Sequence, residues 1–408
     1  MEKLLLEAGR CLKCKKPRCQ MHCPIYTSVP EVITLFEAGK IHEAGEILFE
    51  NNPLSAVCSI VCPHEDQCLG NCIRGIKSTP VKFCEIETYI STQYLEELTI
   101  EKAPFNGKRV AVVGSGPAGI TAAMLLARKG YGVTMFELHD RIGGVLSYGI
   151  PEFRLPRKYV ERLEQKLLQL GVSIKCNTLV GPVITVDKLL SDGYDAIFIG
   201  TGVWNPKTLN IKGETLPHSH YAIDYLKNPK SYHLGKKVVV IGAGNVAMDA
   251  ARSAKYYGAE EVHICYRRGE ESMTATKAEI HEAKEEGVLF TLYKTPVEIT
   301  PEGVVFATTQ MVTGEDGSQK LVTLPDSEEL MSCDSVIIAV SQAPKDNIVA
   351  GTTGLETKYG LLVTDEVGHT TKQGVFACGD VVSGAKTVIA AVVAAKKVAQ
   401  SIDDYLQM

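Results

Sequence analysis

The chain lacks a hydrophobic run long enough to cross a bilayer. Near the C-terminus its longest charge-free apolar stretch, residues 387–395, has nine residues, whereas a membrane-spanning helix needs about 20. The first residues, MEKLLLEAGRC, also lack the apolar core of roughly 7 residues found in secretory signals. Positive charge is not in excess, because 43 Lys and Arg face 48 Asp and Glu. We therefore expect a cytoplasmic protein that binds neither membranes nor nucleic acid.

Cysteine is scarce after residue 84, where the remaining 324 residues contain four, and these form no C-x-x-C pair. This scarcity argues against a dithiol–disulfide reductase. The first 84 residues contain nine of the 13 cysteines, in the patterns C-x2-C-x4-C-x3-C-P and C-x3-C-P-x4-C-x3-C. The two patterns consist of Cys11, Cys14, Cys19 and Cys23, and of Cys58, Cys62, Cys68 and Cys72. In a reducing compartment, clustered thiols of this kind predict metal ligands rather than disulfides.

The paired cysteine patterns favour two [4Fe-4S] clusters. Such clusters are held by four thiolates, and a cysteine followed by proline often ligates the second cluster of a pair. Zinc is the alternative, because all-thiolate zinc sites also use C-x2-C. The surrounding segment has six cations against Glu2 and Glu7, and this positive charge would offset the negative charge of a cluster. These cations are Lys3, Arg10, Lys13, Lys15, Lys16 and Arg18.

A first glycine-rich turn follows the apolar strand RVAVV and predicts a dinucleotide-binding βαβ unit. Gly114, Gly116 and Gly119 form G-x-G-x-x-G, with Pro117 and Ala118 opening the next helix. These glycines allow a tight turn, close approach of a pyrophosphate, and close packing of helix and strand. Glu137 lies at the end of the next strand, where a carboxylate can accept hydrogen bonds from ribose hydroxyls.

A second unit repeats this design after the strand KKVVVI. Gly242, Gly244 and Ala247 form G-x-G-x-x-A. Arg267 and Arg268 replace the acidic residue, and guanidinium groups suit the 2′-phosphate of NADP, so NADP(H) is favoured over NAD(H). Alternatively, one or both arginines are only solvated, with Glu270 and Glu271 close by.

The two units differ in the nucleotide that they favour, because the first has an acidic residue where the second has arginines. This difference indicates FAD on one unit and a nicotinamide nucleotide on the other. The chain resembles flavoproteins whose FAD domain is interrupted by an NAD(P) domain and resumes at a Gly-Asp motif, here Gly379 and Asp380. The resemblance implies that Asp380 holds the ribityl chain and that the helix beginning near Thr387 directs its positive end at the flavin. We expect an α/β fold with an iron–sulfur helical domain at 1–102, an FAD domain at 103–225 and 346–408, and an NAD(P) domain at 226–345.

The whole chain resembles one family of iron–sulfur flavoproteins. Its motifs include CLKCKKPRCQMHCP, ENNPLSAVCSIVCP, YGIPEFRLP and ACGDVVSGAKTVIAAV. The family comprises the small subunit of NADPH-dependent glutamate synthase, the large subunit of the bifurcating ferredoxin–NADP transhydrogenase and the N-terminal half of dihydropyrimidine dehydrogenase. ENNPLSAVC and GAKTVIAAV are most similar to the flavin subunit of bacterial dihydropyrimidine dehydrogenase.

The resemblance also implies which residues ligate the iron–sulfur clusters and which lie near the nucleotides. It implies one cluster on Cys11, Cys14, Cys19 and Cys72, and the other on Cys23, Cys62, Cys68 and Glu87, with Cys84 or Cys58 as alternatives to Glu87. It places Gly144, Val145, Arg154 and the backbone of Val180 near FAD, and Asn245 and Val246 beside the NADP pyrophosphate. The sequence departs from the family at Ser341, where relatives often have glycine, and at Thr274, where some have a phosphate-binding arginine.

These features predict an electron-input subunit of a hetero-oligomer. A hydride from NAD(P)H reaches the flavin, and single electrons leave through the clusters to a catalytic partner, most simply one of the dihydropyrimidine dehydrogenase type. The hydride passes between cofactors, so we assign no catalytic side chain. The alternatives are a glutamate synthase or transhydrogenase subunit, a free-standing flavin reductase, and a zinc-stabilised module without catalytic activity.

Overall fold

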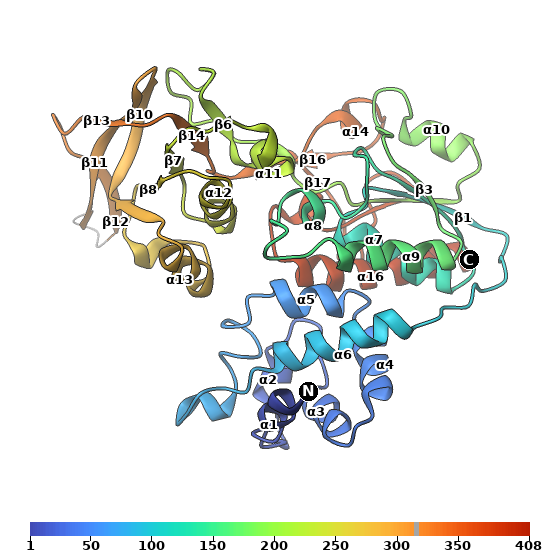
Figure 1. The fold of residues 1–408 in the computed structure, drawn as a ribbon. Coiled ribbons are helices and arrows are strands. Elements are labelled where there is room, and N and C mark those ends of the chain that lie inside the picture. The colour runs from blue at the N-terminus through green and yellow to red at the C-terminus, as the bar shows by residue number, and fades with distance from the viewer. Residues whose placement is uncertain (314–317) are drawn as a thin grey trace. The chain divides into compact units, whose positions relative to one another are not determined.

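The computed structural model describes residues 1–313 and 318–408, which divide into two compact units (Figure 1). The first unit combines Met1–Ser147, Glu152–Val203 and Ala343–Met408. The second combines Tyr148–Pro151 and Trp204–Gln342. The chain therefore leaves the first unit after residue 203 and returns to it at residue 343.

Helices build the cysteine-rich part of the first unit. They are α1 (Glu2–Ala8), α2 (Arg18–Met21), α3 (Val29–Glu37), α4 (Ile41–Asn51), α5 (Ser55–Val61), the 3-10 helix η1 (Ile73–Ile76) and α6 (Phe83–Glu97). Apolar residues spaced three or four apart are buried, such as Val32 and Phe36 in α3. Helix α4 crosses α6 at close range, because a Cβ atom on Gly45 would lie 2.4 Å from Tyr94 Cβ. This packing fixes the loops that carry the cysteines.

The first parallel sheet has the strand order β18-β4-β1-β2-β3. Its strands are β1 (Arg109–Val113), β2 (Gly132–Phe136), β3 (Ser173–Lys175), β4 (Ala196–Ile199) and β18 (Val375–Ala377). Strand β18 comes from the last segment of the chain and pairs in parallel with β4. Strands β1 and β4 are almost wholly apolar because helices cover both faces of such a sheet.

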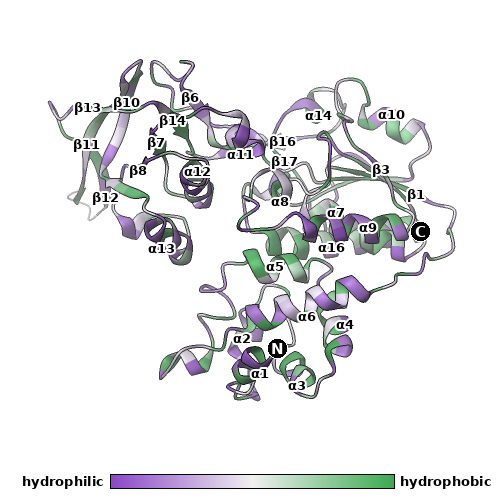
Figure 2. Cartoon of the chain, viewed as in Figure 1, coloured by the Kyte–Doolittle hydropathy of each residue, from purple (hydrophilic) through white to green (hydrophobic). Residues whose placement is uncertain are grey.

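The helices of the same segments include α16, the longest of the described helices. They are α7 (Pro117–Arg128), α8 (Val145–Tyr148), α9 (Lys158–Gln169), α10 (Val186–Ser191), α14 (Asn347–Ala350), α15 (Asp380–Ser383) and α16 (Val388–Gln407), with a short pair of strands β16 (Thr357–Lys358) and β17 (Leu361–Leu362). Figure 2 shows that α16 carries both hydrophobic and hydrophilic residues. None of the helices described here is both long and apolar enough to cross a lipid bilayer.

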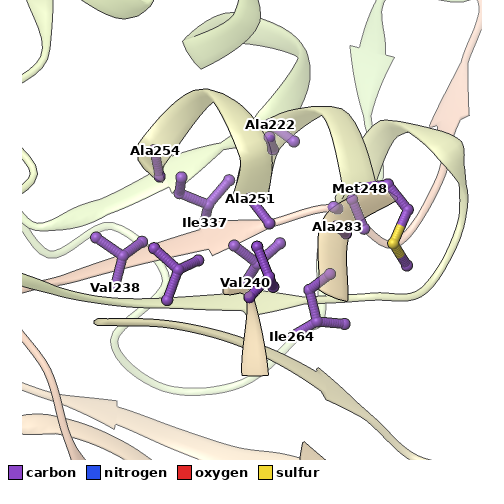
Figure 3. Packing of buried hydrophobic residues seen from close by; sticks show 14 of the residues in the cluster. Ala222, Val238, Val240, Met248, Ala251, Ala254, Ile264, Ala283 and Ile337 are labelled. Atoms are coloured by element: carbon purple, nitrogen blue, oxygen red, sulfur yellow. The ribbon is translucent and has the colours of Figure 1, made fainter. Parts of the chain in front are cut away.

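The second parallel sheet has the order β6-β14-β7-β8-β9. Its strands are β6 (Ser219–Tyr221), β7 (Lys237–Ile241), β8 (Glu261–Tyr266), β9 (Leu289–Leu292) and β14 (Ser335–Ile338). Around it lie α11 (Ala222–Lys227), α12 (Asn245–Tyr256), α13 (Lys277–Glu285) and the 3-10 helices η2 (Pro229–Ser231) and η3 (Glu270–Ser272). Figure 3 shows the core, where Met248 and Ala251 of α12 pack with Val240 and Ile264.

A four-stranded antiparallel sheet extends the second unit. It consists of β10 (Lys294–Thr300), β11 (Gly303–Thr313), β12 (Gln319–Thr323) and β13 (Glu329–Ser332), with β11 pairing with the other three. The sequence analysis did not anticipate it. Two short strands, β5 (Asn205–Pro206) and β15 (Gln342–Ala343), complete the described elements.

The segment before β7 belongs structurally to the second sheet. Strand β6 pairs in parallel with β14, and helix α11 packs against α12. The sequence analysis placed this segment, up to residue 225, with the FAD domain. In the structure the second unit instead begins at Trp204 and ends at Gln342.

Candidate functional site

The first glycine turn leaves an open approach between β1 and α7. Gly114 has a φ of +93°, and a Cβ there would lie 2.6 Å from the carbonyl oxygen of Gly200. A Cβ on Gly119 would lie 2.0 Å from the carbonyl oxygen of Gly114. A Cβ on Gly116, in contrast, meets no atom within 4 Å. Two glycines thus permit the packing of the chain on itself, and the third faces space in which a phosphate fits.

Segments distant in sequence converge on this turn. Gly143 N donates to the Ser115 carbonyl oxygen at 3.0 Å, and a Cβ on Gly144 would lie 2.8 Å from the Cα of Gly116. Val145, which begins α8, follows directly. From the last segment, Gly379 approaches α7, since its Cβ would lie 3.3 Å from that of Ala118. Pro117 and Ala118 are the first two residues of α7.

Glu137 is buried and held in its ionised form at the end of β2. Its carboxylate accepts hydrogen bonds from Ser115 N at 3.1 Å and from His139 N at 2.8 Å. Burial raises the pKa of Glu137, but hydrogen bonds from the side chains and backbones of His139 and Ser115 outweigh this effect and lower it. The sequence analysis missed both partners. Thr178 N donates to the Glu137 carbonyl oxygen, and this bond brings the buried Val180 to the same edge of the sheet.

Asp380 and Thr387 stand at the starts of α15 and α16. Burial raises the pKa of Asp380 to about 6, and its Oδ1 accepts a hydrogen bond from Lys386 N at 3.1 Å. Thr387 caps α16, because its Oγ1 accepts from Ala390 N at 3.3 Å. The positive end of a 20-residue helix therefore lies just after Asp380. Arg154 is half-buried in the loop before α9.

The second glycine turn has the same construction. Gly242 has a φ of +135°, and its Cβ would lie 2.3 Å from the carbonyl oxygen of Ala339. Thr274 lies beside this turn, because a Cβ on Gly244 would come 3.1 Å from Thr274 Oγ1. Ala247 is fully buried against the sheet. Asn245 and Val246 open α12, where backbone N–H groups are free to bind an anion.

The two arginines after β8 differ in their surroundings. Arg267 is exposed, whereas Arg268 is half-buried. Within the described residues, the buried Nε of Arg268 has no hydrogen-bond partner. Glu270 does not compete for it, because its carboxylate pairs with Lys284 at 2.7 Å. A buried cationic donor without an acceptor fits a phosphate group.

Four cysteines of the helical part form one electrostatic group. The pKa of Cys19 is raised to about 11, mainly by burial and also by the neighbouring thiols of Cys72, Cys11 and Cys14. Burial likewise raises the pKa of Cys11, to which Cys14 and Cys72 also contribute. These four thiols therefore lie near enough to one another for their charges to interact.

A second group surrounds Glu87. Burial raises the pKa of Cys68, with contributions from Glu87, Cys84 and Cys23. The pKa of Cys62 is raised by its hydrogen bond to Cys58, by burial and by the charges of Cys58, Glu87 and Cys68. Glu87 is buried on α6, and this burial raises its pKa to about 8. This group contains one more thiol than the first, and it contains a carboxyl group.

Within 1–313 and 318–408, no three His, Cys, Asp or Glu side chains approach closely enough to hold a single metal ion. The structure thus places the thiols in two loose groups.

The second group lies where the helical part meets the first sheet. Cys62 is the C-terminal cap of α5, and α5 packs against α16 and α9 (Figure 1). Arg128 of α7 pairs with Glu50 at 2.5 Å, and Lys396 of α16 donates to the Asn51 carbonyl oxygen. The thiols of this group are therefore anchored against the elements that carry the first glycine turn and Asp380.

Two nucleotide cradles on separate parallel sheets, together with a thiol-rich helical part, define the class of NAD(P)H-dependent flavin oxidoreductases with an iron–sulfur domain. The pyridine nucleotide-disulphide oxidoreductase family model matches residues 108–397. The model for dihydropyrimidine dehydrogenase domain II, 4Fe-4S cluster, matches residues 1–99.

Two relatives and one solved structure illustrate the similarity of this chain to members of this class. The chain is 33% identical to the glutamate synthase [NADPH] small chain of Halomonas elongata, across 98% of this chain and 90% of that one. It is 34% identical to the NADP(+)-dependent formate dehydrogenase subunit beta of Moorella thermoacetica, across 95% of this chain and 60% of the relative. FprA of Mycobacterium tuberculosis in complex with NADPH shares the fold, with a TM-score of 0.63 and 20% identity over 75% of this chain and 85% of FprA.

The chain belongs to the pyridine nucleotide-disulphide oxidoreductase family, within the iron–sulfur flavoproteins that include the glutamate synthase small chain. This confirms the predicted family, the α/β fold class and the enzyme class. Two of these relatives are named as one part of a larger enzyme, a small chain and a subunit beta.

Proposed function

We propose that this chain is an electron-input subunit that oxidises NADPH through FAD and passes single electrons through two [4Fe-4S] clusters to a partner subunit. Bound FAD would supply the exchange between a two-electron hydride and single electrons, and the clusters would carry the single electrons onward. The observation that carries the proposal is the position of Cys62, at the end of the helix that packs against α16. Electrons leaving the flavin would meet this group of thiols first.

The chain's own residues would hold FAD at the carboxyl edge of the first sheet. Gly114, Gly116 and Gly119 would admit the pyrophosphate, which would accept hydrogen bonds from the first turn of α7. Both oxygens of the ionised Glu137 accept hydrogen bonds from Ser115 and His139, so ribose hydroxyls would bind it by displacing a side-chain donor, Ser115 Oγ or the His139 ring. Further contacts would come from Pro117, Ala118, Gly144, Val145, Arg154, Gly379, Asp380 and Thr387.

NADP(H) would occupy the second sheet in the corresponding place. Gly242, Gly244 and Ala247 would shape the turn, with Asn245 and Val246 at the start of α12 beside the pyrophosphate. The unpartnered Nε of Arg268 supports a role in binding the 2′-phosphate. The exposed Arg267 would contribute less, because its charge is screened by water.

The thiol groups support one cluster on Cys11, Cys14, Cys19 and Cys72, and a second on Cys23, Cys62 and Cys68. Glu87 would complete the second cluster, because it is the buried carboxyl group that interacts with Cys62 and Cys68. Cys84 and Cys58 are the competing ligands, since both also lie within this group.

Two partners are supported by different observations. The match of residues 1–99 to the dihydropyrimidine dehydrogenase model supports a subunit that reduces a pyrimidine. The 33% identity to a glutamate synthase small chain supports a glutamate-forming subunit. Both partners fit an electron-input role.

The partner is tested by anaerobic co-expression with each type of catalytic subunit. We expect NADPH-dependent pyrimidine reduction by the first complex and no NADPH-dependent glutamate formation by the second. Glutamate formation alone would transfer the assignment to the glutamate synthase type. Failure of NADPH to reduce either partner or ferricyanide would reject the electron-input function.

A further inference from the structure

A short exposed segment next to the first thiol group combines apolar and basic side chains. We call residues 12–21 the basic loop. Its two ends are apolar and exposed, with Leu12 at 55% and Met21 at 57% of full exposure. Between them lie Cys14 and Cys19 of the first thiol group. Single exposed apolar side chains are common on protein surfaces, so Leu12 and Met21 indicate a binding surface only together with the cations between them.

Three of the four cations of the basic loop form no ion pair with a described residue, whereas the fourth, Lys13, and the nearby Arg10 do. Arg10 pairs with Glu7 and Lys13 pairs with Glu37, both at 2.6 Å. Lys15, Lys16 and Arg18 are exposed, and none of them forms an ion pair with a described residue. A cluster of cations without internal partners remains free to attract an acidic surface.

The charge of this region is opposite to that of the rest of the chain. Residues 1–28 contain six Lys or Arg and two Asp or Glu, which gives +4. Since the whole chain carries −5, the other 380 residues carry −9 (−5 minus +4). An acidic molecule would therefore be drawn to this end of the first unit and repelled elsewhere.

The basic loop also lies at the outer end of the two thiol groups. The second group is anchored against α16 through α5, whereas the basic loop belongs to the first group. In Figure 1, α1 and α2 lie beyond α5 and α6 as seen from α16. An electron acceptor on the basic loop would thus contact the group that is farther from the flavin-binding elements.

We propose that the basic loop is the docking surface for the protein that accepts the electrons, and that this protein presents an acidic face that also carries apolar residues. This inference rests on the proposed electron-input function. The partner is attracted electrostatically by Lys15, Lys16 and Arg18. Once it is bound, water is excluded from the interface by apolar contacts with Leu12 and Met21. The alternative is that these cations only offset the charge of the adjacent cluster.

The test uses the complete FAD- and cluster-loaded protein, reduced photochemically so that the nicotinamide site is not involved. Two small haem proteins serve as one-electron acceptors, the acidic cytochrome b5 and the basic cytochrome c. The variant is Lys15→Glu with Lys16→Glu. Lys358→Glu with Lys397→Glu is the matched control, because both lysines are exposed, lie in the first unit and form no ion pair with a described residue.

We expect the wild type to reduce cytochrome b5 faster than cytochrome c at low salt. Charge reversal in the basic loop should lower the rate with cytochrome b5 roughly tenfold and raise the rate with cytochrome c, and high salt should abolish both effects. The dissociation constant for oxidised cytochrome b5, measured without turnover, should rise in parallel. A change in cluster potential alone would move both rates in the same direction, and this result would overturn the proposal.

Other outcomes are equally decisive. Equal effects of the variant and the control would overturn the proposal, and so would binding of the basic loop to phosphatidylserine vesicles without any preference for the acidic cytochrome. If the reversed variant fails to fold, Lys15→Gln with Lys16→Gln should show the same trend at a smaller size. A wild type that contains FAD and iron but reduces neither cytochrome nor ferricyanide would reject the electron-input function itself.

Discussion

Replacement of Gly116 by alanine should separate cofactor binding from folding. Gly116 has a φ of −68° and a ψ of −174°, a conformation that alanine adopts without strain. A Cβ at this position meets no atom of the chain within 4 Å. The added methyl group therefore points into the space through which we propose that the FAD pyrophosphate approaches.

The expected magnitudes follow from this geometry. Loss of glycine's extra freedom in the unfolded chain should stabilise the flavin-free protein by about 0.4–1 kcal/mol. A methyl group between the turn and the pyrophosphate should cost about 1–3 kcal/mol of binding free energy, as in other overpacked contacts. FAD affinity should therefore fall roughly fivefold to hundredfold.

The assay has two parts and one control. FAD is titrated into flavin-depleted protein by fluorescence, and thermal unfolding of the same preparation is followed by circular dichroism. Gly119→Ala is the control, because its Cβ would lie 2.0 Å from the Gly114 carbonyl oxygen and should destabilise the fold itself. Unchanged FAD affinity in Gly116→Ala, or a lower melting temperature of its flavin-free form, would refute the reasoning.

Three further predictions concern the charged residues of the proposed sites. Arg268→Gln should raise the KM for NADPH roughly tenfold to hundredfold and leave that for NADH nearly unchanged, whereas Arg267→Gln should have a smaller effect; equal losses for both nucleotides would exclude a 2′-phosphate contact. Glu87→Ala should change the electron paramagnetic resonance spectrum and potential of one cluster, while Glu85→Ala on the same helix should not, and an unchanged spectrum would remove Glu87 from the ligands. Asp380 has a folded-state pKa raised to about 6, so its contribution to stability is full below about pH 4 and is lost as the pH rises through 6. Flavin-depleted Asp380→Asn should therefore gain on the order of 1–3 kcal/mol over the wild type between pH 4 and pH 7, as measured by urea unfolding, and a difference that does not vary with pH would contradict this.

Local patterns predicted the parts of the fold that local chemistry determines. The turns around Gly114 and Gly242 were predictable because each follows a continuous apolar strand and requires a positive φ. Pairing of β6 with β14 joins residues more than a hundred positions apart, and no local signal marks it. The antiparallel sheet around β11 instead joins segments close in sequence, with Thr300 opposite Gly303 and Gly303 opposite Ser332, and the sequence analysis overlooked these strands.

In the candidate site, too, residues could be predicted from local spacing, whereas their contact partners could not. The acidic residue at 137 was predictable from its distance to the glycine turn, but its donors were not. Ser115 and His139 reach Glu137 only because the turn and the loop after β2 meet at one edge of the sheet. The separation of the thiols into two groups likewise depends on contacts between α1, α3 and α6, which bring Cys72 beside Cys11.

The most direct test of the electron-input function is to count cofactors and electrons in anaerobically purified protein. We predict one FAD and about eight irons with matching inorganic sulfide per chain. A reductive titration with NADPH should bleach the flavin and then generate two distinct cluster signals. A colourless protein that contains zinc and no flavin, or one whose clusters are never reduced by NADPH, would contradict the account.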